Sequence, residues 1–140
     1  MKKLLKILRN MNKIKFRGKR IDNGEWVYGY LYKNSVTTFI LVDTLIGMID
    51  DVKVISDTVG QFIGLKDKNG VEIYAGDIVK CSYPRKHVAE VKACDVNPSF
   101  LMERHDRGIT CDVEYDFVKC EMQELEVIGN KHTNPELLNK

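Results

Sequence analysis

The sequence predicts a mainly β protein, folded as a small antiparallel barrel or sandwich. From Lys13 onward, apolar and polar residues alternate with a period of two and turn residues separate the runs, which is typical of half-buried strands. Many short strands at close spacing favour a barrel or a two-sheet sandwich. The 140 residues suit a single domain, which we place at 13–140 after an N-terminal extension, residues 1–12.

The first two expected strands, 13–17 and 26–32, lie on either side of an Asp-Asn-Gly turn. One face of the second strand carries four aromatic residues: Trp26, Tyr28, Tyr30 and Tyr32. Such a row can stack on bases or on a peptide, but it more often forms the core wall of a small sheet, with hydroxyl groups at the rim. We favour the core wall, and we expect only Tyr32, near the strand end, to be exposed.

The middle of the chain contains five further runs with strand composition: 37–42, 52–55, 61–65, 71–74 and 78–83. Lys66–Gly70 predicts a hairpin turn, because Asn-Gly readily takes positive φ at adjacent positions. Gly76-Asp77 predicts a second turn, in which the aspartate carboxylate accepts hydrogen bonds from nearby backbone N–H groups. We expect the core from six residues of this region: Phe62, Ile63, Leu65, Ile73, Ile78 and Val79.

The C-terminal part predicts strands at 88–93, 100–102, 109–117 and 125–128. Asn134-Pro135-Glu136 then has the cap, the first-turn proline and the first-turn acid that open a short helix. The first ten residues, MKKLLKILRN, have the pattern of a short amphipathic helix. We therefore expect short helices at both ends of the β domain.

The strand at 109–117 carries three carboxylates on one face: Asp112, Glu114 and Asp116. They can share a hard cation or receive a basic partner, and a metal-dependent enzyme that uses them is our third hypothesis. We favour a solvated strand face, because alternating apolar and charged residues are typical of half-buried antiparallel strands. P-loop, GxGxxG, HExxH and GxSxG motifs are absent from the sequence. We therefore assign no catalytic, metal-ligating or cofactor-binding residue and expect no cofactor.

Charge is unevenly distributed. Residues 1–20 contain nine basic side chains and no acidic one, so the remaining 13 basic and 20 acidic residues give the rest of the chain a net charge of −7. A basic arm can bind nucleic acid weakly and in a salt-sensitive way. The alternative, which we favour, is that the arm is solvated or lies across the acidic body. No apolar run reaches the length of a membrane span.

The four cysteines, Cys81, Cys94, Cys111 and Cys120, are too far apart for a CxxC or zinc-ribbon spacing. Their even number permits two disulfides. We expect free thiols and a cytoplasmic protein, because the chain shows no cleavable signal peptide.

The run from Thr58 to Val79, TVGQFIGLKDKNGVEIYAGDIV, resembles the signature of the YopX family, small proteins from phages and prophages of bacteria. Two further segments agree in order and position: KFRGK at 15–19, and EVIGN at 126–130 followed by NPELL at 134–138. Gly18 departs from the family, which more often has an apolar residue there, and residues 1–12 and 94–120 match no family pattern. The resemblance implies an SH3-like barrel with extra hairpins, and it supplies no function and no catalytic residues.

Three hypotheses follow. The first is a non-enzymatic binding module that engages a protein or a nucleic acid in the bacterial cytoplasm. The second is a homo-oligomeric assembly protein built through an exposed edge strand or a swapped arm. The third is the metal-dependent enzyme. For the binding module we select the following aromatic and basic residues: Trp26, Tyr28, Tyr32, Tyr83, Lys13, Lys15, Arg17, Lys19 and Arg20.

Overall fold

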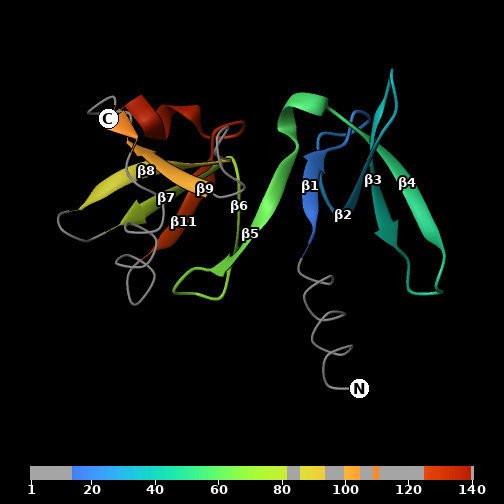
Figure 1. Ribbon diagram of the computed structural model, residues 1–140, viewed down its shortest axis with the longest axis horizontal. Coiled ribbons are helices and arrows are strands. Elements are labelled where there is room, and N and C mark those ends of the chain that lie inside the picture. Colours follow the sequence, from blue (N-terminus) through green and yellow to red (C-terminus); the bar gives the residue numbers. More distant parts are fainter. Residues whose placement is uncertain (1–13, 82–85, 94–99, 105–108, 111–124, 140) are drawn as a thin grey trace. The chain divides into compact units, whose positions relative to one another are not determined.

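Short antiparallel strands dominate the computed structural model, as Figure 1 shows. The structure describes residues 14–81, 86–93, 100–104, 109–110 and 125–139. The mainly β prediction is confirmed, and the two helices among the described residues are both short 3-10 helices. The chain divides into two compact units, residues 1–64 and 65–140. The single domain that we expect over 13–140 stays a prediction.

Unit 1 is built on a curled antiparallel sheet. Its elements are β1 (Phe16–Lys19), β2 (Trp26–Lys33), β3 (Thr38–Asp43), β4 (Ile49–Val54), the 3-10 helix η1 (Ser56–Thr58) and the beginning of β5 (Gly60–Lys66). The strands follow the order β4-β3-β2-β1-β5, and each neighbouring pair is antiparallel. The boundaries of β2 agree with the sequence prediction to within one residue.

Backbone hydrogen bonds bring the end of β4 back to the end of β1. The Ile55 N–H donates to the Lys19 carbonyl at 2.8 Å, and the Ile21 N–H donates to the Lys53 carbonyl at 3.2 Å. The Thr58 hydroxyl accepts from the Lys19 N–H at 2.9 Å and donates to the Ile55 carbonyl at 2.6 Å. Unit 1 therefore has a small, tightly enclosed interior.

Small residues line this interior where strands approach closely. A Cβ atom added to Gly18 would lie 3.0 Å from the Val54 side chain. A Cβ atom added to Gly29 would overlap the backbone carbonyl of Leu41. Ile40 and Val54 fill the space that remains and are almost completely buried. These contacts leave no room for a side chain at Gly18 or Gly29 themselves.

Unit 2 contains the end of β5 and most of the remaining strands. Its other elements are β6 (Glu72–Tyr74), β7 (Asp77–Cys81), β8 (His87–Ala93), β9 (Phe100–Arg104), β10 (Ile109–Thr110), β11 (Glu126–Asn130) and the 3-10 helix η2 (Pro135–Asn139). A five-stranded antiparallel sheet has the order β10-β9-β8-β7-β11. Its core includes Ile73, Tyr74, Ile78, Val79, Ala89, Val91 and Leu125.

Asp67 organises the hairpin between β5 and β6 and joins it to β11. Its carboxylate accepts hydrogen bonds from the N–H groups of Asn69 at 2.8 Å, Val71 at 2.9 Å and Val127 at 3.0 Å. Burial acts to raise the pKa of Asp67 and is the largest single influence, but the three N–H groups outweigh it and the pKa lies below its ordinary value. Only Gly70 of the Asn-Gly pair has positive φ, at 81°, so the predicted pair of positive φ values is wrong.

The hairpin from β7 to β8 and the turn before it agree with the prediction. The Asp77 carboxylate accepts a hydrogen bond from the Tyr74 N–H at 2.8 Å, and the Asp77 side chain is buried. β7 pairs with β8 from Ile78 opposite Glu90 to Cys81 opposite His87. The expected C-terminal helix is present as η2. The expected N-terminal helix and residues 111–117 lie outside the described part of the chain.

The structure differs from the sequence predictions in the closure of the sheet and in the state of one cysteine. The described strands form two antiparallel sheets rather than one closed barrel. Cys81 is fully buried and disulfide-bonded, so the expectation of free thiols is wrong at this position. Cysteine spacing along the chain does not reveal which sulfur atoms the fold brings within bonding distance. Cys94, Cys111 and Cys120 lie outside the described residues.

Candidate functional site

The register between β1 and β2 places basic and aromatic side chains on the same face of unit 1. Arg17 lies opposite Tyr28, and Lys19 lies opposite Trp26. Residues directly opposite in an antiparallel pair share a face, and so do alternate residues along each strand. The resulting surface, which we call the basic–aromatic face, comprises Lys15, Arg17, Lys19, Trp26, Tyr28, Tyr30 and Tyr32.

Cations stack on two aromatic rings at this face. The guanidinium carbon of Arg17 lies 4.6 Å from the ring centroid of Trp26, and the Lys19 ammonium lies 5.6 Å from the same centroid. The Lys15 ammonium lies 5.2 Å from the ring centroid of Phe62, on β5. These distances fall within the range of cation–π attraction. They fix the position of positive charge along β1, next to the tyrosines of β2.

The three tyrosines of β2 are half exposed. The exposed fractions of Tyr28, Tyr30 and Tyr32 are 49%, 46% and 52%. Tyr32 also contacts Phe39 on β3, with ring centroids 5.9 Å apart and the planes tilted by 39°. The prediction that this row forms the core wall is therefore wrong. The close approaches at Gly18 and Gly29 bring β3 and β4 against one face of β1 and β2, and the aromatic residues of β2 lie on the opposite face.

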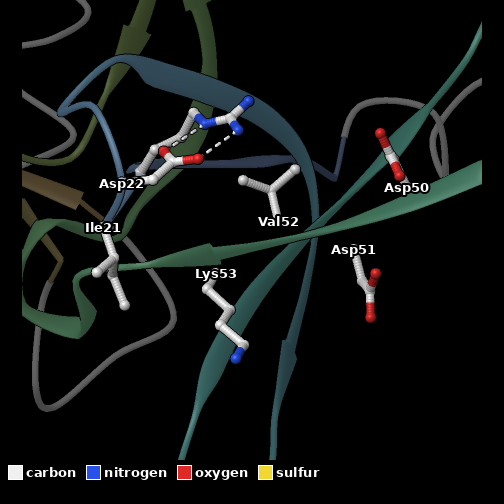
Figure 2. Close-up of a pocket in the computed structure, with 7 residues that line it drawn as sticks. Ile21, Asp22, Asp50, Asp51, Val52 and Lys53 are labelled. Atoms are coloured by element: carbon white, nitrogen blue, oxygen red, sulfur yellow. Dashed lines mark hydrogen bonds and ion pairs between the residues drawn. The ribbon is translucent and has the colours of Figure 1, made fainter.

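Arg20 lies apart from the basic–aromatic face, in a pocket of about 380 Å³ between the turn after β1 and strand β4 (Figure 2). The lining residues are Arg20, Ile21, Asp22, Asp50, Asp51, Val52 and Lys53. Figure 2 shows two dashed lines between the Asp22 carboxylate and the Arg20 guanidinium, while Asp50 and Asp51 lie away from this pair. The Arg20 Nε and a terminal nitrogen donate to the two Asp22 oxygens at 2.8 and 2.7 Å.

This ion pair shifts the titration of both partners. The side-chain hydrogen bond is the main cause, and it raises the pKa of Arg20 and lowers the pKa of Asp22. The Arg20 guanidinium is thus occupied by Asp22 and does not join the other basic residues selected from the sequence. The pocket contains carboxylates from two segments, but no cluster of His, Cys, Asp and Glu within the described ranges could hold a metal ion.

The structure brings together six of the nine selected residues: Lys15, Arg17, Lys19, Trp26, Tyr28 and Tyr32. Lys13 and Tyr83 lie outside the described part of the chain, as do Asp112, Glu114 and Asp116. Tyr30 belongs to the same surface but was not among the residues selected from the sequence. Its position in the period-two alternation of β2 is sufficient to place it on this face. Within the described residues, no helix is long and apolar enough to cross a membrane.

Comparisons with known proteins agree with the fold. The model of the family described as YopX protein matches residues 15–139. The crystal structure of protein EF1440 from Enterococcus faecalis is similar, with 28% sequence identity and a TM-score of 0.55 over 89% of this chain and 97% of that chain. None of the curated proteins matches the chain. The chain therefore belongs to the YopX family.

Proposed function

We propose that this YopX-family protein is a non-enzymatic binding module whose basic–aromatic face holds single-stranded nucleic acid. The observation that carries the proposal is the row of three half-exposed tyrosines on β2 beside the cations of β1. Proteins that bind single strands without sequence preference combine a positively charged track with aromatic rings on which bases stack. A surface of this composition suits a flexible anionic chain with unpaired bases.

The geometry of β2 favours an extended ligand. Tyr28, Tyr30 and Tyr32 alternate along one strand, so their rings repeat at about 6.8 Å. A regular row of rings can receive successive bases, because each base presents a flat π surface. Lys15, just before β1, and Lys19, at the end of β1, supply positive charge along one side of the row.

The proposal extends to the architecture of unit 1 and to the origin of the protein. The β4–β1 hydrogen bonds of unit 1 support an SH3-like barrel as its architecture. Family membership supports a phage or prophage origin and action in the bacterial cytoplasm. We assign no cofactor to the module.

The test is fluorescence anisotropy with a labelled oligothymidine and a labelled oligouridine, using the full chain. Replacing Tyr28, Tyr30 and Tyr32 together with alanine should weaken binding by at least about tenfold, because each stacked base contributes about 1–3 kcal/mol. Replacing the same residues with phenylalanine should preserve binding, because the phenyl ring still stacks. Circular dichroism of each variant checks that the fold is intact.

The charge contribution has a matched control. Lys15→Gln with Lys19→Gln should weaken binding, whereas Lys80→Gln with Lys86→Gln, two exposed lysines of unit 2, should leave binding unchanged. Equal losses in both pairs would show that binding depends on net charge alone. Unchanged affinity in the triple alanine variant would refute the stacking surface. If neither oligonucleotide binds at low salt, nucleic acid is excluded as the ligand of this face.

A further inference from the structure

The hairpin turn between β3 and β4 exposes an unusually apolar tip. The exposed fractions of Leu45, Ile46, Met48 and Ile49 are 108%, 80%, 63% and 65%. Turns at hairpin tips ordinarily carry Gly, Asn, Asp, Pro or Ser. Single exposed apolar residues are common, but four within five consecutive positions form a contiguous patch that is typical of an interaction site. We call these four residues the apolar tip.

The apolar tip is held in a defined conformation. The Thr44 N–H donates to the Met48 carbonyl at 2.8 Å, the Thr44 hydroxyl donates to the same carbonyl at 2.8 Å, and the Met48 N–H donates back to that hydroxyl at 3.1 Å. The Gly47 N–H donates to the Thr44 carbonyl at 3.0 Å, and Gly47 has a φ of 78°, which glycine adopts without strain. A partner therefore meets a backbone that is already ordered and loses little entropy on docking.

Negative charge surrounds the apolar tip. Asp43 precedes the turn, Asp50 and Asp51 follow it, and all three are exposed. Residues 34–52 contain no lysine or arginine. A surface of this kind repels anionic lipid headgroups and favours an apolar segment that carries positive charge.

The chain itself contains such a segment. The N-terminal extension, residues 1–12, has four apolar residues and four basic residues within its first nine positions: Leu4, Leu5, Ile7, Leu8, Lys2, Lys3, Lys6 and Arg9. It lies outside the described part of the chain, which begins at Ile14 in unit 1. Leu8 and Leu4 precede Ile14 by 6 and 10 residues, so an extended chain carries them up to about 20 and 35 Å from it, distances on the scale of a unit of 64 residues.

We propose that the N-terminal extension covers the apolar tip of its own chain, with its leucines on Leu45 and Ile46 and its basic side chains beside Asp50 and Asp51. Attachment to the same unit gives the extension a millimolar effective concentration, which favours this contact over exchange with another copy. The contact is separate from the basic–aromatic face.

The test uses Met48 as an internal reporter in the full chain. Oxidation of methionine by dilute peroxide requires an accessible sulfur, and peptide mass spectrometry measures the rate at Met48 alone. In Leu4→Ser, Leu5→Ser, Leu8→Ser, which keeps every charge, oxidation of Met48 should be faster by on the order of threefold, because a contact whose dissociation constant is about half of the effective concentration covers Met48 for about two thirds of the time. Asp50→Asn with Asp51→Asn should accelerate oxidation too, and the control Asp57→Asn should not.

Three outcomes would overturn the proposal. Equal Met48 oxidation rates in the parent chain and the triple serine variant would show that the extension does not cover the apolar tip. Protection that disappears on dilution, with a dimer mass by light scattering, would assign the cover to a second copy. Protection of Met48 that requires added phosphatidylcholine vesicles would assign the apolar tip to a lipid surface.

Discussion

Replacing Asp67 should show whether its carboxylate stabilises the fold or serves only as a polar residue of the turn. Asp67 is 8% exposed, and its three backbone hydrogen bonds tie the β5–β6 turn to β11, which is 60 residues away along the chain. Asp67→Ala removes all three acceptor contacts. Asp67→Asn keeps an oxygen for the turn amides, but it can present an NH2 group to the Val127 N–H, where two donors oppose each other.

The loss in the free energy of unfolding depends on which of the three N–H groups water can reach once Asp67 is replaced. Asn69 and Val71 are exposed, so water can replace Asp67 as their acceptor, whereas Val127 is half-buried in β11. A hydrogen bond to a charged group contributes about 1.5–3 kcal/mol. We therefore expect Asp67→Ala to lower the free energy of unfolding by about 2–4 kcal/mol, and Asp67→Asn by about half as much.

The pH dependence gives an independent test. The pKa of Asp67 is lower in the folded protein than in the unfolded chain. The stabilisation is therefore complete above the unfolded value of about 3.9, and it is lost as the pH falls through the folded-state value. Urea unfolding followed by circular dichroism at pH 7 and near pH 3 should show a large difference between Asp67→Ala and the parent at pH 7, and a smaller one at low pH.

Asp57 provides the control because it is an exposed aspartate in η1. Asp57→Ala should leave the unfolding midpoint unchanged at both pH values. A loss below about 1 kcal/mol in Asp67→Ala would contradict the role assigned to the three hydrogen bonds. A difference that persists undiminished at low pH would show that packing, and not the carboxylate charge, accounts for the effect.

Three further predictions concern backbone and surface positions. Gly70→Ala should destabilise the protein by about 1 kcal/mol or more in urea unfolding, because φ is 81° at this residue. Gly18→Ala should be destabilising alone and less so together with Val54→Ala, which removes the Val54 Cγ2 and Cγ1 atoms 3.0 and 3.2 Å from the new Cβ and leaves only the Val54 Cβ close to it; a double-mutant cycle measures this coupling. Arg20→Gln should leave the unfolding midpoint nearly unchanged, because its ion pair with Asp22 is open to solvent, with side chains 33% and 63% exposed, and such surface pairs contribute little to stability.

Sequence patterns located the strands and much of the core. Glycine and aspartate positions at the turns limit where each strand can end, which is why the prediction succeeded from the Asp67 turn to the end of β7. Ile73, Ile78 and Val79 were expected in the core and are completely buried. Phe62 was expected there too and is 9% exposed. Local turn chemistry and period-two alternation are sufficient for these positions. Ile63 and Leu65 were also expected in the core but are only half-buried, because they alternate with Phe62 and lie on the other face of β5.

The orientation of β2 could not be predicted from alternation. The period-two alternation of β2 predicts that Trp26 and Tyr28 share a face, but it does not indicate which face is buried. That choice depends on Gly18 and Gly29, whose close contacts come from strands β3 and β4. Hydrophobicity favours burying the aromatic row, and tertiary packing overrides this preference because β3 and β4 pack closely against Gly18 and Gly29 on the other face. The apolar tip was missed because the turn departs from the usual composition of hairpin loops.

The salt dependence of nucleic-acid binding distinguishes the basic–aromatic face from the whole basic arm. Nine basic residues lie in positions 1–20, and nine phosphate contacts would give a slope of about −6 for log K against log salt, at about −0.7 per contact for single strands.

Fewer cations are available on the basic–aromatic face itself, because Arg17 is buried under Trp26 and Arg20 lies apart from this face, paired with Asp22. Lys15 and Lys19 then supply two contacts, and a slope of about −1.4 is expected. Anisotropy titrations between low and moderate salt measure the slope directly. A slope near −6 would assign binding to the arm as a whole and would refute the stacking surface as the main determinant of affinity.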